Sequence, residues 1–266
     1  MKIVVCVKQV PEVTNVQVDA VTGTLIREGV KSMLNPFCEY ALDHAVRLKR
    51  QDNKITIIAI TMGPPQAKDA LLRCLELGAD EAVLVTDRKF AGADTWATAY
   101  TLSEAIRCHI PDYNLIFVGK QAIDGDTAQV GPEIAEILGL PQITYGVEAA
   151  LDSSRKHVRV KQEVERGYDV IQAALPALVT FSKGEVVRRA PSFLDVINAR
   201  MKPLQVIKAG DLNLDEESIG LAGSYTQVVQ VFPPPQKKSS RMLTNQEPQQ
   251  AAQELLNFLK ERHFIG

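Results

Sequence analysis

Positive charge is not in excess in this sequence of 266 residues, because 30 Lys and Arg stand against 32 Asp and Glu. The formal net charge of -2 argues against a nucleic-acid-binding protein that works through bulk positive charge. Long apolar runs are also lacking. The first one, residues 3–7, is short, is followed by Lys8 and has no signal-peptide cleavage pattern, and none approaches the ~20 residues of a bilayer-spanning helix. We therefore expect a cytoplasmic protein that binds neither nucleic acid nor membrane.

Cysteine and histidine are too scattered to suggest a metal site. The four cysteines are Cys6, Cys38, Cys74 and Cys108, without a CxxC pair or a histidine at ligand spacing. We expect four free thiols in a reducing compartment. No Ser-His-Asp pattern is present either, so the sequence predicts no catalytic side chain of its own.

The first 140 residues or so alternate between short apolar runs and amphipathic segments. The sequence predicts strands at 2–7, 55–60, 81–85 and 115–118, and helices at 37–50, 67–77, 95–106 and 127–138. Gly78 and Gly139 follow two of these helices, as C-terminal glycines do, and Asp94 is a suitable N-cap for a third. The alternation predicts an α/β fold, an open and mostly parallel sheet with helices on both faces.

A different pattern follows residue 142. Segments 158–164 and 168–175 flank Arg166-Gly167 like a hairpin, and 178–181 reads as a further strand. Residues 183–208 are basic, 209–248 have little periodicity, and 249–262 read as an amphipathic helix. An extended arm before an isolated helix cannot bury itself alone, so we expect it to wrap around a partner. We divide the chain into a nucleotide-binding domain, 1–185, and a partner-binding segment, 186–266.

The stretch from Gly119 to Glu133 carries the clearest chemical signal, because it follows a strand and opens a helix. Asp126 and Gln129 can form a capping box, and Gly125 tolerates positive φ and leaves room for the close approach of a ligand. The N–H groups from about Thr127 to Gln129 would then point at an anion such as a phosphate. Neither a Walker A loop nor GxGxxG is present, so an ordinary capped helix stays open beside a nucleotide-phosphate site.

A second turn, Ala91 to Thr95, also lies at a predicted helix start. Ligands of parallel sheets bind at the carboxyl ends of strands, and two helix N-termini facing one crevice suit a pyrophosphate better than a single phosphate. Asn35-Pro36 and Met62-Gly63-Pro64 are further candidates for the rim. For Asn35-Pro36 alone, a plain helix entry is the competing interpretation.

Four separated motifs resemble the electron transfer flavoprotein β subunit. They are Val7 to Pro11, Asn35 to Glu39, Gly119 to Gln129, and Val160 to Thr180 with its Leu175-Pro176-Ala177. The resemblance covers essentially the whole chain. It implies an adenine-nucleotide α-hydrolase-like sheet and a heterodimer with an α subunit. It also implies a bound adenine nucleotide, which is structural AMP in housekeeping members and FAD in electron-bifurcating members.

The resemblance points to the bifurcating branch, because Ala93 to Thr95 is similar to its pyrophosphate-contacting segment and AMP-type members usually carry another residue in place of Gly125. Cys6 would act through its backbone, so its thiol would have no redox role. The residues implied to line the nucleotide are Cys6, Asn35, Pro36, Phe37, Cys38, Met62, Gly63, Ala93, Asp94, Thr95, Thr98, Gly119, Lys120, Gln121, Ala122, Ile123, Asp124, Gly125, Asp126, Thr127, Ala128, Gln129 and Val130.

The basic segment matches the recognition loop of that family in position. The residues implied to dock a partner are Arg188, Arg189, Phe193, Leu194, Ile197 and Arg200. The partner would be an acyl-CoA dehydrogenase or a flavin-dependent hydroxy-acid dehydrogenase. NAD(H) would be a transient substrate, and ferredoxin or flavodoxin would accept low-potential electrons. The alternatives are a non-bifurcating β subunit with AMP, and a stand-alone nucleotide-binding module.

Overall fold

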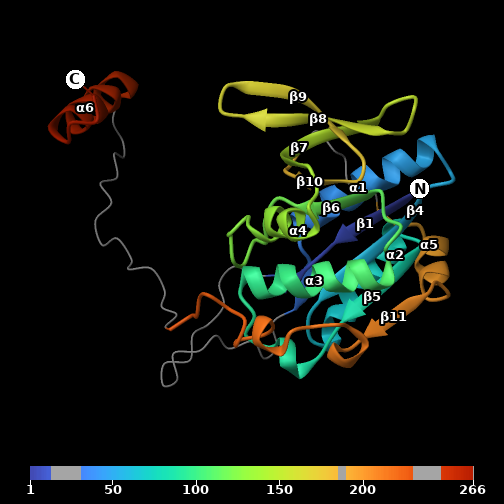
Figure 1. Cartoon of the computed structure of the whole chain (residues 1–266). Helices are drawn as coiled ribbons and strands as arrows, with labels where there is room; N and C mark the ends of the chain where they lie inside the picture. Colours follow the sequence, from blue (N-terminus) through green and yellow to red (C-terminus); the bar gives the residue numbers. More distant parts are fainter. Residues whose placement is uncertain (13–30, 185–189, 230–246, 266) are drawn as a thin grey trace.

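The computed structural model describes residues 1–12, 31–184, 190–229 and 247–265. Its centre is a nine-stranded sheet in the order β11-β5-β4-β1-β6-β10-β7-β8-β9 (Figure 1). These strands are β1 (Lys2–Cys6), β4 (Thr56–Met62), β5 (Glu81–Val85), β6 (Leu115–Gly119), β7 (Gln142–Leu151), β8 (His157–Val164), β9 (Gly167–Ala174), β10 (Ala177–Phe181) and β11 (Leu204–Ile207). The pairs from β11 to β7 are parallel, and β8 and β9 pair antiparallel. The predicted α/β fold, open and mostly parallel, is confirmed.

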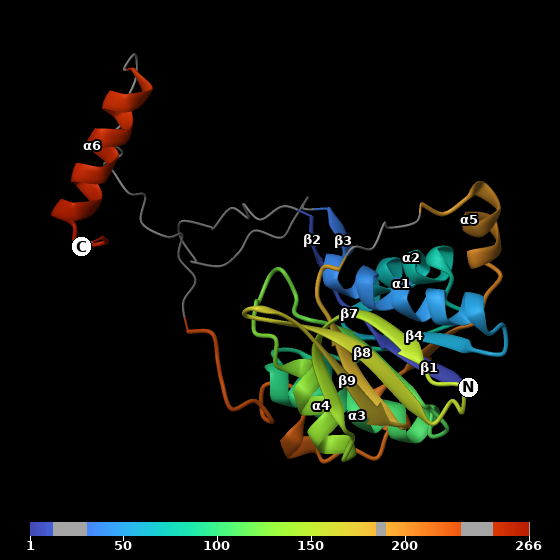
Figure 2. The ribbon, with the colours of Figure 1, turned by 90° about the horizontal axis from the view of Figure 1, so that it is seen from above.

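Helices cover both faces of this sheet, as predicted (Figure 2). The helices are α1 (Pro36–Gln51), α2 (Lys68–Leu77), α3 (Thr95–His109), α4 (Val130–Leu138), α5 (Phe193–Ala199) and α6 (Pro248–Glu261). Successive residues of β1 point to opposite faces, so Ile3 and Val5 pack in the core with α1 and α2, whereas Val4 packs with α3 and α4. A central strand buried on both faces needs an unbroken apolar run, and that run made β1 predictable.

Shorter elements complete the chain. Strands β2 (Gln9–Pro11) and β3 (Ser32–Leu34) form a separate antiparallel pair. The 3₁₀ turns are η1 (Pro65–Ala67), η2 (Arg88–Phe90), η3 (Ala209–Asp211) and η4 (Glu216–Ser218). Helix α6 exposes the apolar side chains of Leu255, Leu256 and Phe258, and Figure 1 draws it apart from the sheet. Residues 230–246 of the predicted arm lie outside the described part of the chain.

Two strands of the sheet were not predicted. In β7 the backbone of Tyr145 has φ of 54°, and the register against β8 shifts between Gly146 and Glu148, so the alternation is broken. Strand β11 has four residues and follows the predicted boundary at residue 185, yet it pairs in parallel with β5. The sheet therefore draws one edge strand from the segment assigned to partner binding.

No helix among the described residues is long and apolar enough to cross a membrane.

Candidate functional site

The candidate residues gather at the carboxyl edge of the parallel strands. Cys6, Met62 and Gly119 are the last residues of β1, β4 and β6, which are neighbours in the sheet. Cys6 is buried, and this burial, together with the nearby Cys38 thiol, raises the pKa of Cys6 to about 12. A thiol with so high a pKa is almost entirely protonated near neutral pH, and it is the thiolate that acts as the nucleophile.

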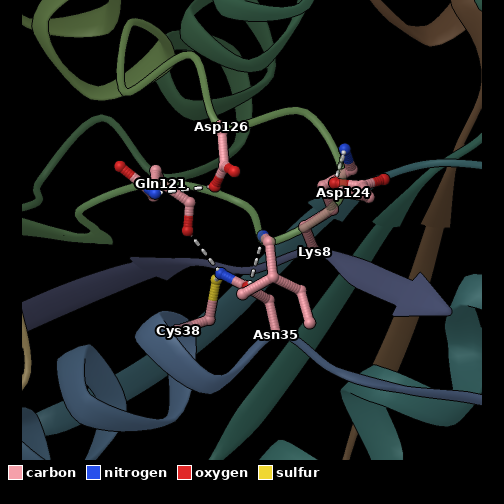
Figure 3. A network of polar contacts seen from close by, with 7 residues as sticks. Lys8, Asn35, Cys38, Gln121, Asp124 and Asp126 are labelled. Carbon is pink, nitrogen blue, oxygen red and sulfur yellow. Dashed lines mark hydrogen bonds and ion pairs between the residues drawn. The ribbon is translucent and has the colours of Figure 1, made fainter. Parts of the chain in front are cut away.

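Asn35 ties the start of α1 to the loop after β6 (Figure 3). Its side-chain Nδ2 donates to the carbonyl of Gln121 at 2.8 Å, and its Oδ1 accepts from the N–H of Ile123 at 3.2 Å. Nδ2 also lies 3.2 Å from the sulfur of Cys38, and the residue is only 1% exposed. Asn35 precedes α1 but does not cap it with its side chain, because the loop takes those hydrogen bonds. A plain helix entry does not describe it.

Gly119 lets α1 approach the end of β6. A Cβ atom built there would lie 2.7 Å from the carbonyl carbon of Phe37 and 2.8 Å from the nitrogen of Cys38. Only glycine fits so close to a neighbouring backbone. The structure thus brings the predicted segments 35–38 and 119–123 together.

The loop from Lys120 to Gln129 differs from the prediction. Helix α4 begins at Val130, its preceding residue Gln129 makes no side-chain cap, and the predicted capping box between Asp126 and Gln129 is absent. Positive φ, which Gly125 could have adopted without strain, occurs instead at Asp126 (51°) and Ala128 (56°). A non-glycine left-handed backbone costs roughly 1–2 kcal/mol per residue, so two such residues mark a loop held in an unusual shape.

Side chains of this loop form polar contacts with one another and with Lys8, which follows β1. Lys8 pairs with Asp124 at 2.8 Å, and Gln121 donates to Asp126 at 2.7 Å (Figure 3). A Cβ added at Gly125 would meet nothing within 4 Å. Polar contacts of Asp124 and Asp126 therefore fix the loop on both sides of Gly125, whereas the space beside Gly125 itself is unoccupied by protein atoms.

The N-terminus of α3 is capped by Asp94, as predicted, through its side chain and the N–H of Ala97. The same carboxylate accepts from the N–H and hydroxyl of Thr226, and Ser224 accepts from the N–H of Asp94. Burial acts to raise the pKa of Asp94, but the hydrogen bonds from Ala97 and Thr226 outweigh it and the pKa is lowered. Residues 219–226, which we call the strap, thus fasten across the start of this helix.

The N-termini of α3 and α4 meet at a polar cluster. The hydroxyl of Thr95 lies 3.0 Å from Oε1 of Glu133 and 3.4 Å from Oε1 of Gln129. Strands β5 and β6 are not neighbours, yet the helices that follow them pack side by side, which brings the predicted turn at 93–95 to the end of the 119–130 loop.

Free backbone donors line this meeting point. Among the described residues, the N–H groups of Thr95 and Trp96 on α3 and of Val130 and Gly131 on α4 have no hydrogen-bond acceptor. Two helix N-termini with unpaired donors are suited to a phosphate or a pyrophosphate. The chemistry is that predicted from the sequence, although α4 itself begins at Val130, three residues after the predicted start.

The predicted docking residues lie elsewhere. Phe193, Leu194 and Ile197 are exposed on α5, and Arg200 follows it. Lys202 donates to the carbonyls of Leu75 and Ala79, which fixes the end of α5 near the start of β5, at the opposite edge of the sheet from the loops. Arg188 and Arg189 lie outside the described residues.

Several site residues were missed. Glu133, Ser224 and Thr226 contact the predicted turns, and Lys8 pairs with the loop. Lys8 directly follows the first predicted strand, and Glu133 lies in the predicted helix 127–138 that follows the loop. Both residues could therefore have been predicted as site residues from the sequence. Nothing in the sequence near Ser224 and Thr226 links them to Asp94.

Comparison with known proteins gives a consistent result. A family model described as the electron transfer flavoprotein domain matches residues 22–212. The chain is 44% identical over 266 residues to the electron transfer flavoprotein subunit beta of Clostridium acetobutylicum, with all of both chains covered. It is 43% identical over 265 residues to the caffeyl-CoA reductase-Etf complex subunit CarD of Acetobacterium woodii, again over both whole chains. It is 38% identical over 271 residues to the acryloyl-CoA reductase electron transfer subunit gamma of Anaerotignum propionicum, with the same full coverage.

Proposed function

The chain belongs to the electron transfer flavoprotein family, and we propose that it is the β subunit of a heterodimer that binds FAD and NAD(H). In this proposal it carries out flavin-based electron bifurcation together with an α subunit. When bound, the flavin would accept a hydride from NADH and deliver its two electrons to separate acceptors, a ferredoxin or flavodoxin and, through the α subunit, a dehydrogenase.

One observation supports a dinucleotide more than AMP. Two helix N-termini, each with two free N–H groups, meet where Thr95 approaches Gln129 and Glu133. One phosphate needs one such terminus, whereas a pyrophosphate can use both. The open space beside Gly125 would let the backbone of the loop approach the ligand closely.

This chain's own groups would bind and orient the flavin. Asn35 would hold the 121–123 part of the loop, and the backbone amides of α3 and α4 would take the negative charge of the phosphates. No side chain of the described site needs to act as an acid, a base or a nucleophile.

Two exposed apolar surfaces would bind the protein partners. Helix α6 leaves its apolar side chains in solvent, which suits an arm that wraps the α subunit. On α5, Phe193 is 78% and Leu194 67% exposed, which suits an anchor for the dehydrogenase. Two of the relatives carry the names of CoA-thioester reductases, and this favours an acyl-CoA dehydrogenase over a hydroxy-acid dehydrogenase as the partner.

The nucleotide content of the purified heterodimer tests the proposal. After denaturation, we expect two FAD per heterodimer by chromatography and absorbance. One FAD with one AMP would exclude FAD on this chain and, with it, bifurcation.

A matched pair of variants tests the placement of the loop. Because a Cβ atom at Gly125 would have no protein atom within 4 Å, we expect Gly125→Ala and Gly125→Asp both to fold. We expect only Gly125→Asp to lose FAD, since its charge would face the phosphates. Equal FAD occupancy in the two variants would contradict a phosphate position beside this residue.

A further inference from the structure

The strap is fastened to the start of α3 by contacts that the function proposed above does not use. The N–H and the hydroxyl of Thr226 donate to Oδ2 of Asp94, at 2.9 and 3.0 Å. The hydroxyl of Ser224 accepts from the N–H of Asp94 at 2.8 Å. Between these two residues, the ring of Tyr225 lies 5.9 Å from the ring of Trp96 on α3. Three consecutive residues of the strap thus contact the start of this helix.

The first part of the strap is fixed in a different way, by close backbone packing. A Cβ atom at Gly220 would lie 2.0 Å from the carbonyl oxygen of Lys89, and the backbone of Gly220 has φ of 55°. A Cβ atom at Gly92, in the turn before α3, would lie 3.3 Å from the Cβ of Leu221. Packing therefore fixes the first part of the strap. The hydrogen bonds to Asp94 fix its last part, from which the chain continues to α6.

Both carboxylate oxygens of Asp94 are used within the chain. Oδ1 accepts from the N–H of Ala97 at 3.1 Å, and Oδ2 takes the two hydrogen bonds from Thr226. Burial acts to raise the pKa of Asp94, but its hydrogen bonds lower it, so the group is charged near neutral pH. A negative charge repels a phosphate placed at the same helix N-terminus. The side chain is therefore suited to hold the strap, and the backbone N–H groups are suited to the phosphate.

We propose that Asp94 is a positioning residue for the C-terminal arm, the chain from residue 227 onward. By fastening the strap it sets where the arm leaves the α/β domain, and it thereby favours binding of α6 to the α subunit. This inference rests on the role proposed above for α6. A strap that is already in place has fewer residues to order when the heterodimer forms, and ordering each residue costs free energy.

The variant Asp94→Asn separates the strap from the helix cap. Asn is as good an N-cap as Asp, so Oδ1 can still accept from Ala97. The amide Nδ2 that replaces Oδ2 donates hydrogen bonds and cannot accept those of Thr226. The variant also removes a negative charge from the proposed phosphate site. The matched control is Asp69→Asn, which removes the same charge from the exposed first turn of α2.

Two dissociation constants of the heterodimer give the test. Sedimentation velocity on dilution measures the Kd of the α subunit, and titration of the nucleotide-depleted heterodimer measures the Kd of FAD. In Asp94→Asn we expect the α-subunit Kd to rise about ten-fold, close to the cost of ordering one residue. The FAD Kd should stay the same or fall, because the phosphates no longer face the charge. The amide of Thr226 should exchange hydrogen faster, and Asp69→Asn should change none of these values.

A second variant, Thr226→Val, removes one of the fastening hydrogen bonds and leaves the charge of Asp94 in place. It should weaken α-subunit binding by less than Asp94→Asn does and leave the FAD Kd unchanged. Equal α-subunit Kd values in wild type and Asp94→Asn would reject the role of Asp94. A rise of both Kd values in Asp94→Asn would reject it too, because a residue that only supports the fold, or one that contacts the nucleotide, gives that result.

Leu255→Ser on α6 shows which proposal has failed. Leu255 is 53% exposed, so the substitution leaves the described fold intact. If it raises the α-subunit Kd while Asp94→Asn does not, only the inference about Asp94 is lost. If it leaves the α-subunit Kd unchanged, α6 does not bind the α subunit, and the role proposed for the arm fails together with the inference.

Discussion

Asn35 offers the sharpest test of how the loop after β6 is held. Asn35→Ala removes the hydrogen bonds to the carbonyl of Gln121 (2.8 Å) and from the N–H of Ile123 (3.2 Å), together with the contact to the Cys38 sulfur (3.2 Å). The side chain is buried, at 1% exposure, so water cannot readily replace these partners. Each lost hydrogen bond is worth about 1 kcal/mol, with a further cost for groups left unpaired. We expect the free energy of unfolding to fall by about 2–4 kcal/mol.

Lys8→Ala is the matched comparison, because Lys8 contacts the same loop through a surface ion pair. The side chains of Lys8 and Asp124 are 49% and 33% exposed. Exposed pairs of this kind contribute about 0–1 kcal/mol, so this variant should lose far less stability than Asn35→Ala.

Urea denaturation of the full chain measures the stability difference, and amide hydrogen exchange of Ile123 reports the loop directly. In Asn35→Ala that amide should exchange faster, and in Lys8→Ala it should keep its protection. The reasoning fails if the two variants lose equal stability, or if the amide of Ile123 stays protected without Asn35.

Three further predictions concern other parts of the molecule. Gly119→Ala should cost about 1–3 kcal/mol of stability by calorimetry, because its Cβ would meet the backbone of Phe37, whereas Gly125→Ala should cost less than about 0.5 kcal/mol. Phe193→Ser should slow electron transfer to the dehydrogenase without changing the melting temperature, and Val229→Ser, at another exposed position, should change neither; a lower melting temperature would show that Phe193 supports the fold. His44 is buried against Phe181, and burial, aided by the charge of Arg47, lowers its pKa to about 4. The unfolded chain then binds the extra proton between about pH 6.5 and 4, so stability should fall by up to about 3 kcal/mol as pH drops through that window. A His44→Gln variant with the same pH dependence would contradict this.

The central strands and the helices between them were predictable because their signals are local. The apolar run of β1, the cap at Asp94 and the stop at Gly139 each depend on residues adjacent in sequence. The order of the strands was not predictable in the same way. It depends on which faces pack together, and β11 in particular is a short strand whose Gln205 and Val206 face solvent.

In the candidate site too, features with local sequence signals were predictable and features that depend on distant residues were not. Sequence reasoning located the 119–130 loop and the 93–95 turn, and both lie where expected. It misplaced the start of α4 because Asp126, followed by Gln129, has the spacing of a capping box, while the actual backbone turns at Asp126 and Ala128 in a left-handed conformation. It also missed the strap, since hydrogen bonds between Asp94 and Thr226 join residues that are 132 positions apart.

The late position of β11 in the chain affects how the protein is made. Leu204 to Ile207 pair with Ala82 to Val85, so β5 is synthesised more than a hundred residues before the strand that completes its edge. At roughly 5–20 residues per second, the ribosome leaves that edge open for many seconds. An apolar edge strand with unpaired backbone groups is a template for pairing with other chains. A chain that stops near residue 185 would keep β5 open permanently, and aggregation is therefore the expected fate of such a fragment.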